Sequence, residues 1–304
     1  MGHMRDADVE RLVARRFGGR ARDLSFLAAG EWSTAYGFVL DGREAVVRVG
    51  RHVDDFAKDR VMGGFSTRIL PIPRVLEIGE AECGCYAVSE RVHGRPIDEV
   101  GAEDMRALLP RLLEALQALG ALSLPGRSGF GLWRADGAAP SRTWAGALLA
   151  APDPQRMPGW RQRLDASPEE AGLFDAGLER LHGLASSLPD VQRIVHGDLL
   201  NRNVLTEGDR ISGVIDWGNA LLGDPLYDIA WLWYWWPWYP AWRGVDLPEF
   251  LDRHWAHGDS GPPDWPARLR PYLIHIGLAH VAYCAFRGRT ADLRRNARQL
   301  KSYL

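Results

Sequence analysis

Residues 194–230, IVHGDLLNRNVLTEGDRISGVIDWGNALLGDPLYDIA, carry the pattern that decides the fold. A strand-like apolar entry leads to His196 and Asp198, Asn203 stands five positions after that aspartate, and a predicted hairpin turning at EGDR leads to Asp216. Phosphoryl transfer needs one carboxylate to accept a hydroxyl proton, and an amide oxygen and a second carboxylate to hold magnesium against the phosphates. Asp198, Asn203 and Asp216 fit these three roles.

The spacing around these residues makes a chance match hard to sustain. An H-x-D-x(4)-N match alone is common, and a lone aspartate in such a place is often a turn or helix-cap residue. Here the match is followed by a hairpin, by VID and, seven residues after Asp216, by GDP. We therefore interpret the three residues as one set.

The rest of the chain divides near residue 94 into a strand-rich first third and a helix-rich remainder. Residues 24–50 and 70–92 predict strands of a small antiparallel sheet, with turns at a Gly/Ser/Thr stretch and at DGRE. Apolar residues at helical spacing predict helices at residues 9–17, 54–65, 97–122, 169–188 and 270–300. Pro110 is expected to end or kink the third of these helices. The pattern indicates the α+β class.

The composition argues against several classes of protein. With 37 basic and 39 acidic residues the net charge is −2, so no bulk electrostatic case exists for binding nucleic acid or an anionic membrane surface. The aromatic run at residues 229–242 is interrupted by two prolines and is shorter than the roughly 20 residues of a membrane span. Three cysteines are too few for a disulfide framework, which favours a reduced cytoplasm. The first four residues, MGHM, look like the remnant of a cleaved tag, with Met4 as the native start and no signal peptide after it.

Several motifs between about residue 20 and about residue 285 resemble one family, the aminoglycoside phosphotransferases: GEWSTAYGF, LPIPRVLEIGE, SGFG, TW, VHGDLLNRNVL, VIDW, GDPLYDIA and WPW. LPIP, SGFG and WPW make the chain most similar to the members that act on hygromycin B. The resemblance implies a bilobed protein-kinase-like fold. Residues 1–93 would form a small antiparallel-sheet lobe that binds nucleotide, and residues 94–304 a larger helical lobe for catalysis and substrate binding.

The same resemblance assigns roles in the catalytic segment. It makes Asp198 the catalytic base and makes Asn203 and Asp216 the magnesium ligands. His196 and Asp228 are expected to support the structure, because in similar folds such residues hold the catalytic loop in place by hydrogen bonds. Losing either would damage activity through position and not through chemistry.

On the nucleotide side, the resemblance implies a site for ATP or GTP. Ser33 and Thr34 belong to the turn over the phosphates, although GEWSTAYG lacks the G-x-G-x-x-G of protein kinases. Backbone N–H groups and hydroxyls can bind phosphate equally well. The backbone of Glu90 and Val92 is expected to meet the adenine.

Arg48, in AVVRVG, stands where a lysine is usual in the family. Arginine can bind phosphate bidentately, but it is not equivalent to lysine. The resemblance implies an acidic partner for Arg48 on the following helix, which would be Asp59 or, as a weaker candidate, Asp55.

Aminoglycosides are polycationic sugars, so a site for them needs carboxylates and flat apolar surfaces. If residues 226–236 form a helix that Pro237 ends, helical spacing places three tryptophans on one stripe, Trp231, Trp235 and Trp238, and points Trp233 and Trp236 elsewhere. The resemblance falls on Trp235 and Trp238, which we expect to contact the substrate while the other three fill the core. Asn201 and Arg202 are expected within reach of the acceptor hydroxyl, and the candidates for substrate carboxylates are Asp153, Glu169 and Glu170.

The sequence therefore predicts an ATP- and magnesium-dependent kinase that phosphorylates hygromycin B or a related aminoglycoside and gives antibiotic resistance. We expect a cytoplasmic monomer that binds a small molecule and neither nucleic acid nor a membrane. One alternative is a kinase of the same fold for another sugar, a choline-like amine or an amino alcohol. Another is a non-catalytic pseudokinase. Protein-kinase activity is disfavoured, because no long activation segment ending in A-P-E follows Asp216.

Overall fold

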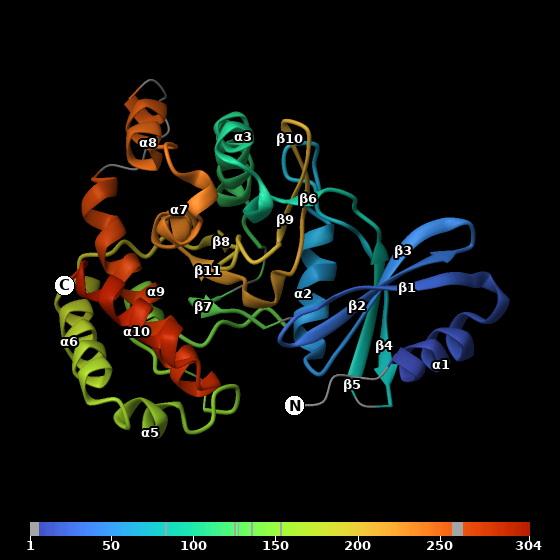
Figure 1. Cartoon of the computed structure of the whole chain (residues 1–304), viewed down its shortest axis with the longest axis horizontal. Coiled ribbons are helices and arrows are strands. Elements are labelled where there is room, and N and C mark those ends of the chain that lie inside the picture. The colour runs from blue at the N-terminus through green and yellow to red at the C-terminus, as the bar shows by residue number, and fades with distance from the viewer. Residues whose placement is uncertain are drawn as a thin grey trace. The chain divides into compact units, whose positions relative to one another are not determined.

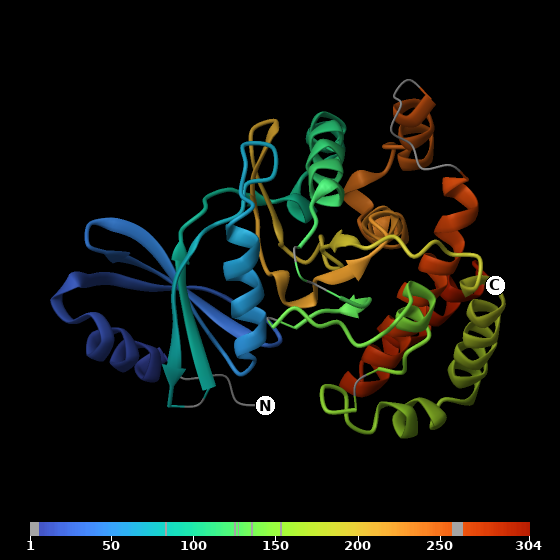
Figure 2. The same cartoon turned by 180° about the vertical axis from the view of Figure 1, so that it is seen from behind.

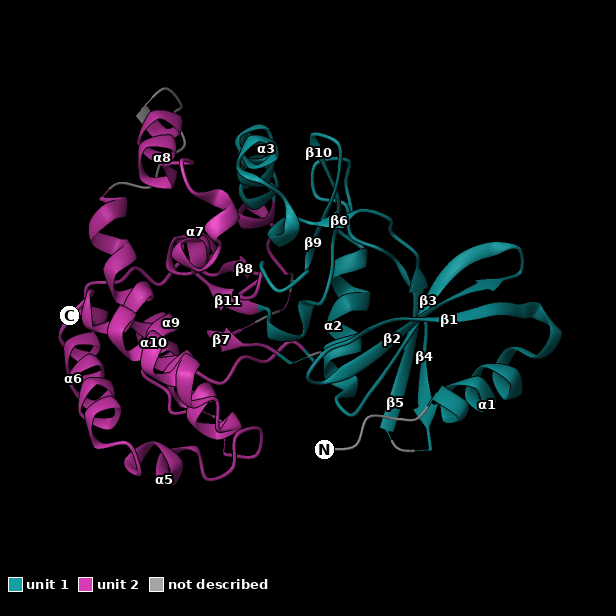
Figure 3. Cartoon of the chain, in the orientation of Figure 1, with its two compact units in different colours: residues 1–118, 134–136, 200–220 teal, residues 119–133, 137–199, 221–304 magenta. Residues whose placement is uncertain are grey.

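The computed structural model describes residues 6–82, 84–124, 126, 128–134, 136–152, 154–256 and 264–304. These form two compact units, each discontinuous in sequence (Figure 3). Unit 1 comprises residues 1–118, 134–136 and 200–220, and unit 2 comprises residues 119–133, 137–199 and 221–304. The segment with the catalytic motifs is shared between them, because the chain passes from unit 2 to unit 1 after Leu199. The division into lobes after residue 93 stays a prediction, and the expected tag remnant lies outside the described residues.

Unit 1 is built on a five-stranded sheet that is antiparallel throughout (Figure 1). Its strands are β1 (Ala21–Ala29), β2 (Ser33–Leu40), β3 (Arg43–Gly50), β4 (Val75–Ala81) and β5 (Gly84–Glu90), in the order β1-β2-β3-β5-β4. The predicted turn at DGRE joins β2 to β3: Asp41 and Gly42 both have positive φ, 51° and 80°. Two such residues form the hairpin turn whose twist matches that of the flanking strands.

Helices cover both faces of this sheet. Successive side chains of a strand point to opposite faces, and in β5 Tyr86 and Val88 pack in one cluster with α1 (Asp6–Phe17). Cys85 and Ala87, the alternate residues, pack against Phe56 of α2 (Val53–Gly63). Because both faces of β5 are covered, its sequence reads as a continuous apolar run.

A second, three-stranded sheet in unit 1 holds the predicted hairpin. β9 (Val204–Glu207) turns through Gly208 into β10 (Arg210–Val214), and β6 (Arg95–Pro96) pairs with the other edge of β9. The 3₁₀ helix η2 (Ile97–Glu99) follows β6, and the 3₁₀ helix η3 (Trp217–Asn219) follows β10.

Of the two outcomes expected at Pro110, an end or a kink of the helix, the structure excludes the end. α3 runs through it from Ala102 to Ala121, with residues 102–118 in unit 1. A proline inside a helix costs about 3 kcal/mol. The leucines around it, at positions 108, 109, 112 and 113, are all buried, and each contributes about 1.5–3 kcal/mol. Burial of this apolar face outweighs the missing hydrogen bond.

Unit 2 contains a three-stranded sheet and most of the helices. The strands are β7 (Gly131–Leu132), β8 (Arg193–Val195) and β11 (Leu221–Gly223), in the order β7-β11-β8. The helices are α4 (Trp144–Leu148), α5 (Trp160–Asp165), α6 (Pro168–Ala185), α7 (Leu226–Trp235), α8 (Leu247–Ala256), α9 (Trp265–Arg287) and α10 (Thr290–Lys301). Helix α9 contacts α5, α6, α7 and α10 and so forms the centre of the unit (Figure 2).

The predicted helical stretch at residues 270–300 is two helices. Gly288, with φ 67°, caps α9 in the left-handed conformation, and α10 begins two residues later. Glycine takes this conformation without strain and commonly ends a helix in this way. Among the described residues, no helix is long and apolar enough to cross a membrane.

Candidate active site

The hairpin of unit 1 brings Asn203 and Asp216 to the same end of two strands. The β9–β10 ladder finishes at the pair Val204 and Val214. Beyond it, the Ile215 N–H donates to the carbonyl of Asn203 at 2.9 Å. Asn203 stands directly before β9, and Asp216 follows Ile215. The two predicted magnesium ligands are therefore neighbours within unit 1.

Asp216 has an unusual backbone and an open side chain. Its φ and ψ are 63° and 67°, in the left-handed region that L-residues seldom occupy. Its side chain is 48% exposed. The surrounding structure must therefore hold the backbone of this residue while its carboxylate stays accessible.

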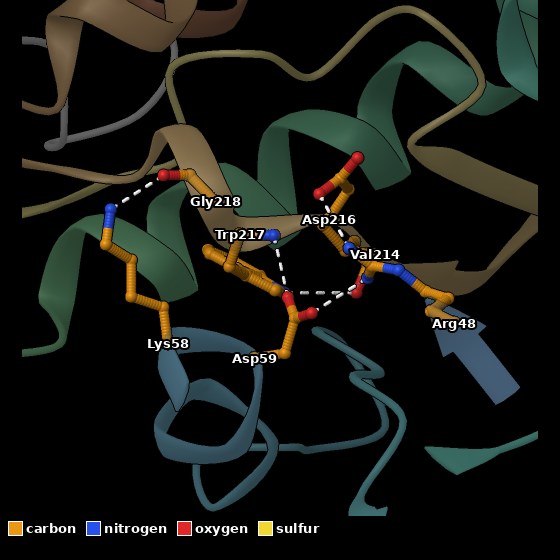
Figure 4. Close-up of polar contacts among 7 residues, drawn as sticks. All are labelled: Arg48, Lys58, Asp59, Val214, Asp216, Trp217 and Gly218. Carbon is orange, nitrogen blue, oxygen red and sulfur yellow. Dashed lines mark hydrogen bonds and ion pairs between the residues drawn. The ribbon is translucent and has the colours of Figure 1, made fainter. Parts of the chain in front are cut away.

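Arg48 links Asp216 to α2 (Figure 4). Its Nη1 donates to Oδ2 of Asp59 at 2.8 Å, and its Nη2 donates to Oδ1 of Asp216 at 3.1 Å. Its guanidinium also lies over the ring of Phe56, 5.1 Å from the centroid. The predicted pairing of Arg48 with Asp59 is present in the structure. The weaker candidate Asp55 lies against Gly218, and its charge also acts on Arg48.

Burial shifts the pKa values of this pair. Burial raises the pKa of Asp59 to about 6, against the lowering effect of Arg48. For Arg48, burial alone would lower the pKa, but the carboxylates of Asp59 and Asp216 hold it above the usual arginine value. The guanidinium therefore stays charged. A positive charge within about 4–6 Å of a carboxyl group favours the ionised form of that group.

The predicted supporting pair lies in unit 2, together with Asp198. Asp228, in the first turn of α7, is 1% exposed. Its Oδ2 accepts the His196 N–H at 2.8 Å, and its Oδ1 accepts the Gly197 N–H at 2.9 Å. The Asp198 N–H in turn donates to Nδ1 of His196 at 3.2 Å. Asp228 thus fixes the two peptide groups immediately before Asp198.

The phosphate turn and the predicted adenine contacts all lie in unit 1. The Gly30 N–H donates to the Ser33 carbonyl at 2.8 Å, which closes the turn before β2. Thr34 is buried, whereas Ser33 is partly exposed. At the end of β5, the Glu90 N–H already donates to the carbonyl of Arg74 at 3.0 Å. Because the Glu90 N–H is already bonded, the adenine contact predicted for this residue would use its carbonyl. Val92 packs against Gly213, where a Cβ would come within 2.6 Å of its Cγ1.

Asn201 and Arg202, also in unit 1, both have left-handed backbones, with φ 65° and 69°. The Arg202 N–H donates to Oδ1 of Asp98 at 3.2 Å, and its guanidinium pairs with the carboxylate of Glu99. Asp98 and Glu99 are the last two residues of η2. Sequence reasoning missed these two carboxylates, because their partner lies more than 100 positions away and only their charge marks them in the sequence.

Helix α7 ends at Trp235, one residue before the predicted end, and Trp236–Trp238 form a 3₁₀ helix that includes Pro237. The five tryptophans still form the two predicted groups. The ring centroids of Trp231 and Trp235 are 6.0 Å apart, and those of Trp235 and Trp238 are 5.0 Å apart. Trp233 instead contacts Trp265, and Trp236 contacts Trp242. Only Trp231 is fully buried, and the other four stay partly exposed. Burial alone therefore does not single out the predicted pair.

Contacts distinguish the two predicted substrate tryptophans from each other. The guanidinium of Arg295 lies 3.7 Å from the ring centroid of Trp238, and the indole N–H of Trp238 donates to Gln299. The ring of Trp235 lies edge-on to His280, at 4.4 Å between centroids. Of the other predicted substrate residues, Glu169 and Glu170 lie in the first turn of α6, and Asp153 lies outside the described residues.

The sheet of unit 1, the Arg48–Asp59 ion pair and the Asn203–Asp216 pair define the class of the protein as a kinase-like phosphotransferase. The phosphotransferase enzyme family matches residues 23–272, and the chain belongs to this family. The prediction of an α+β, protein-kinase-like fold and of membership among the aminoglycoside phosphotransferases is confirmed.

The chain is also similar to individual members of the family. The chain is 34% identical to a hygromycin-B 4-O-kinase of Escherichia coli over 272 residues, which are 89% of this chain and 76% of the relative. The crystal structure of aminoglycoside phosphotransferase APH(4)-Ia matches with a TM-score of 0.86 at 31% identity, over 98% of each chain. A thermostable mutant of that enzyme, in ternary complex with AMP-PNP and hygromycin B, matches with a TM-score of 0.84, also at 31% identity, over 97% of each chain.

Proposed function

We propose that the protein is an ATP- and magnesium-dependent kinase that phosphorylates a hydroxyl of hygromycin B or a related aminoglycoside, and so gives resistance to the drug. The observation that carries the proposal is the 34% identity to a hygromycin-B 4-O-kinase over 89% of the chain. The ternary complex of a related structure with AMP-PNP and hygromycin B supports both the nucleotide and the acceptor. The retained Asp198, Asn203 and Asp216 argue against a pseudokinase.

The residues at the end of the β9–β10 hairpin suit magnesium. Magnesium prefers oxygen ligands, and in kinases it is held by one or two protein groups together with substrate phosphates and water. Asn203 offers an amide oxygen and Asp216 an accessible carboxylate, and the backbones that carry them are neighbours. When bound there, the metal would neutralise charge on the transferred phosphoryl group.

The other residues would bind nucleotide and move the proton. Asp198 would accept the proton of the acceptor hydroxyl, and Asp228 would hold the two peptide groups before it. Arg48 would bind nucleotide phosphate through its guanidinium, oriented by Asp59. The turn at Gly30–Ser33 would add backbone N–H groups and the Ser33 hydroxyl.

We also propose carboxylates for the cationic acceptor. Glu99 pairs with Arg202. Arg202 lies two residues after Leu200, where the part of the catalytic segment that belongs to unit 1 begins. Both side chains of this ion pair are largely exposed, so the pair contributes little and can exchange partners. An ammonium group of the aminoglycoside would replace Arg202 as the partner of Glu99. Trp235 and Trp238 would provide the apolar surface for a sugar ring.

Mass spectrometry tests the activity directly. The protein is incubated with magnesium, hygromycin B and either ATP or GTP, and the drug is expected to gain one phosphoryl group. Asp198→Ala should abolish this gain and the survival of cells on hygromycin B while the protein still folds. A screen of nucleotide turnover with other sugars, choline-like amines and amino alcohols covers the alternative acceptors. Turnover with one of these and none with hygromycin B would replace the proposed substrate.

The proposal includes a cytoplasmic monomer. Light scattering at the working concentration measures the mass directly, and a dimer mass would contradict this part. Cell fractionation would test the compartment.

A further inference from the structure

Lys58 is a buried cation that the proposed chemistry does not use. The chain has 37 basic residues, of which only Lys58 and Lys301 are lysines. Lys58 lies in α2, directly before Asp59, and is 1% exposed. Its Nζ donates to the backbone carbonyl of Gly218 at 2.6 Å. Burying a charged amine is unfavourable unless it is hydrogen-bonded. The fold of unit 1 therefore depends on this contact to keep Lys58 buried.

Two neighbouring residues of α2, Lys58 and Asp59, bind the backbone of the two residues that follow Asp216 (Figure 4). Lys58 holds the carbonyl of Gly218, and Oδ1 of Asp59 accepts the N–H of Trp217 at 2.9 Å. Asp55, one turn earlier in the helix, lies so close to Gly218 that an added Cβ would be 3.0 Å from its Cγ. We call this set of contacts between α2 and residues 217–218 the α2 clamp.

The α2 clamp acts immediately after the left-handed residue Asp216. An aspartate in that conformation persists only when its surroundings hold it there. In the next two residues, α2 binds the N–H of Trp217 and the carbonyl of Gly218. We propose that Lys58 is a positioning residue for Asp216: through the Gly218 carbonyl, it holds the Asp216 carboxylate in the orientation that binds magnesium. This inference rests on the proposed function for the role of Asp216, while the clamp itself does not.

The choice of lysine suits this task. A lysine ammonium is a compact donor at the end of a flexible chain, whereas a guanidinium is a planar fork that needs more room and more acceptors. In a chain that otherwise uses arginine almost throughout, a lysine reaches the buried carbonyl of Gly218. The role of Lys58 also differs from that of Arg48, which contacts the Asp216 carboxylate directly.

The two lysines allow the clamp to be tested without any substrate. The native protein is treated with an acetylating reagent, and the modification of each lysine is followed by peptide mass spectrometry. Lys301 is exposed and serves as the internal standard. We expect Lys58 to react at least ~100-fold more slowly, because it becomes accessible only when unit 1 opens locally. Equal rates would overturn the clamp.

A glycine substitution releases the clamp from the other side. Gly218→Ala introduces a Cβ against Asp55, and Lys58 should then react about 10-fold faster or more. Gly172→Ala is the matched control, because a Cβ at Gly172, in α6, would meet nothing within 4 Å. Unchanged protection of Lys58 in Gly218→Ala would contradict the assigned contact.

Binding measurements test the effect on magnesium. Titration calorimetry compares the affinity for AMP-PNP with magnesium and with EDTA in the wild type and in Lys58→Met. We expect the gain from magnesium to fall about 10-fold in the variant and the metal-free affinity to stay within about 2-fold. An unchanged magnesium gain would overturn the positioning role. If Lys58→Met does not fold, Lys58→Gln replaces it, because its amide can still donate to the Gly218 carbonyl in part.

These measurements separate the two proposals. Absence of AMP-PNP binding in the wild type would count against the proposed function and, with it, the positioning role for magnesium. The acetylation rates would still decide whether the α2 clamp exists. A loss of thermal stability in Lys58→Met with a full magnesium gain would assign Lys58 a structural role only, and would also overturn the inference.

Discussion

Nη1 of Arg48 lies 2.8 Å from Oδ2 of Asp59, and this contact joins β3 to α2 in the part of unit 1 that leads to Asp216. Both side chains are largely buried, with 18% and 10% of their surfaces exposed. An arginine at this position therefore keeps the pairing that a kinase-like fold usually builds with lysine. Its second contact, to Asp216, uses the fork that lysine lacks.

Removal of Arg48 should destabilise the protein, because it leaves a buried carboxylate without its cation. Arg48→Met leaves Asp59 without its cation, so we expect the free energy of unfolding to fall by about 3–5 kcal/mol. Urea denaturation measures the loss. The double variant Arg48→Met with Asp59→Leu removes both charges and should recover part of it, less the cost of the Trp217 N–H that loses its acceptor. A double variant as unstable as the single one would contradict the buried pair as the cause.

Asp228 should make stability depend on pH in a predictable direction. Burial raises its pKa to about 7, although the N–H groups of Gly197 and His196 lower it. The folded protein therefore binds the proton more tightly than the unfolded chain, whose aspartate pKa is near 3.8. The contribution to stability is complete below about pH 4 and is lost as the pH rises through about 7.

The variant Asp228→Asn isolates this contribution. Asparagine cannot titrate, and its NH₂ group cannot accept the second backbone N–H, so the variant should be less stable and less active. Urea midpoints are measured for both proteins between pH 5 and pH 8. The stability difference between wild type and variant should shrink as the pH rises. A difference that is constant or grows with pH would show that Asp228 does not titrate in this window.

The sequence was sufficient to predict that Asn203 and Asp216 are neighbours, because one hairpin joins them. The spacing of Asn203 and Asp216 in the chain encodes their arrangement within unit 1, whereas the role of Asp198 beside them stays a prediction. Asp228 and His196 lie next to the same motifs. Helical spacing similarly separated Trp231, Trp235 and Trp238 from Trp233 and Trp236, because neighbours three and four apart share a helix face.

The remaining contacts could not be read from the sequence. Lys58 and Gly218 are 160 positions apart, and Arg202 and Glu99 are 103 apart. No periodicity marks either pair, since the contacts depend on how α2 and η2 pack in unit 1. At Pro110, local propensity allowed either an end or a kink, and it could not show that α3 continues, because burial of the flanking leucines decides this.

Glu99 should affect the aminoglycoside and not the nucleotide. If its carboxylate exchanges Arg202 for an ammonium group of the drug, Glu99→Gln should raise KM for hygromycin B about 5- to 10-fold. KM for ATP should stay within about 2-fold. Glu114→Gln is the matched control, because Glu114 forms a similar exposed ion pair with Arg111 within α3. A change confined to the ATP KM would contradict the assignment.

The proposed sugar platform predicts a contrast between tryptophans of one segment. Trp235→Leu and Trp238→Leu should each raise KM for hygromycin B about 10-fold, because a flat aromatic surface is lost. Trp233→Leu is the control: it lies two residues before Trp235 but contacts Trp265, so KM should stay within about 2-fold. Trp238 should be the less sensitive of the pair, since the guanidinium of Arg295 already covers one face of its ring. Steady-state kinetics at saturating ATP measure all three variants, and equal effects at positions 233, 235 and 238 would indicate loss of packing around α7 in place of a substrate contact.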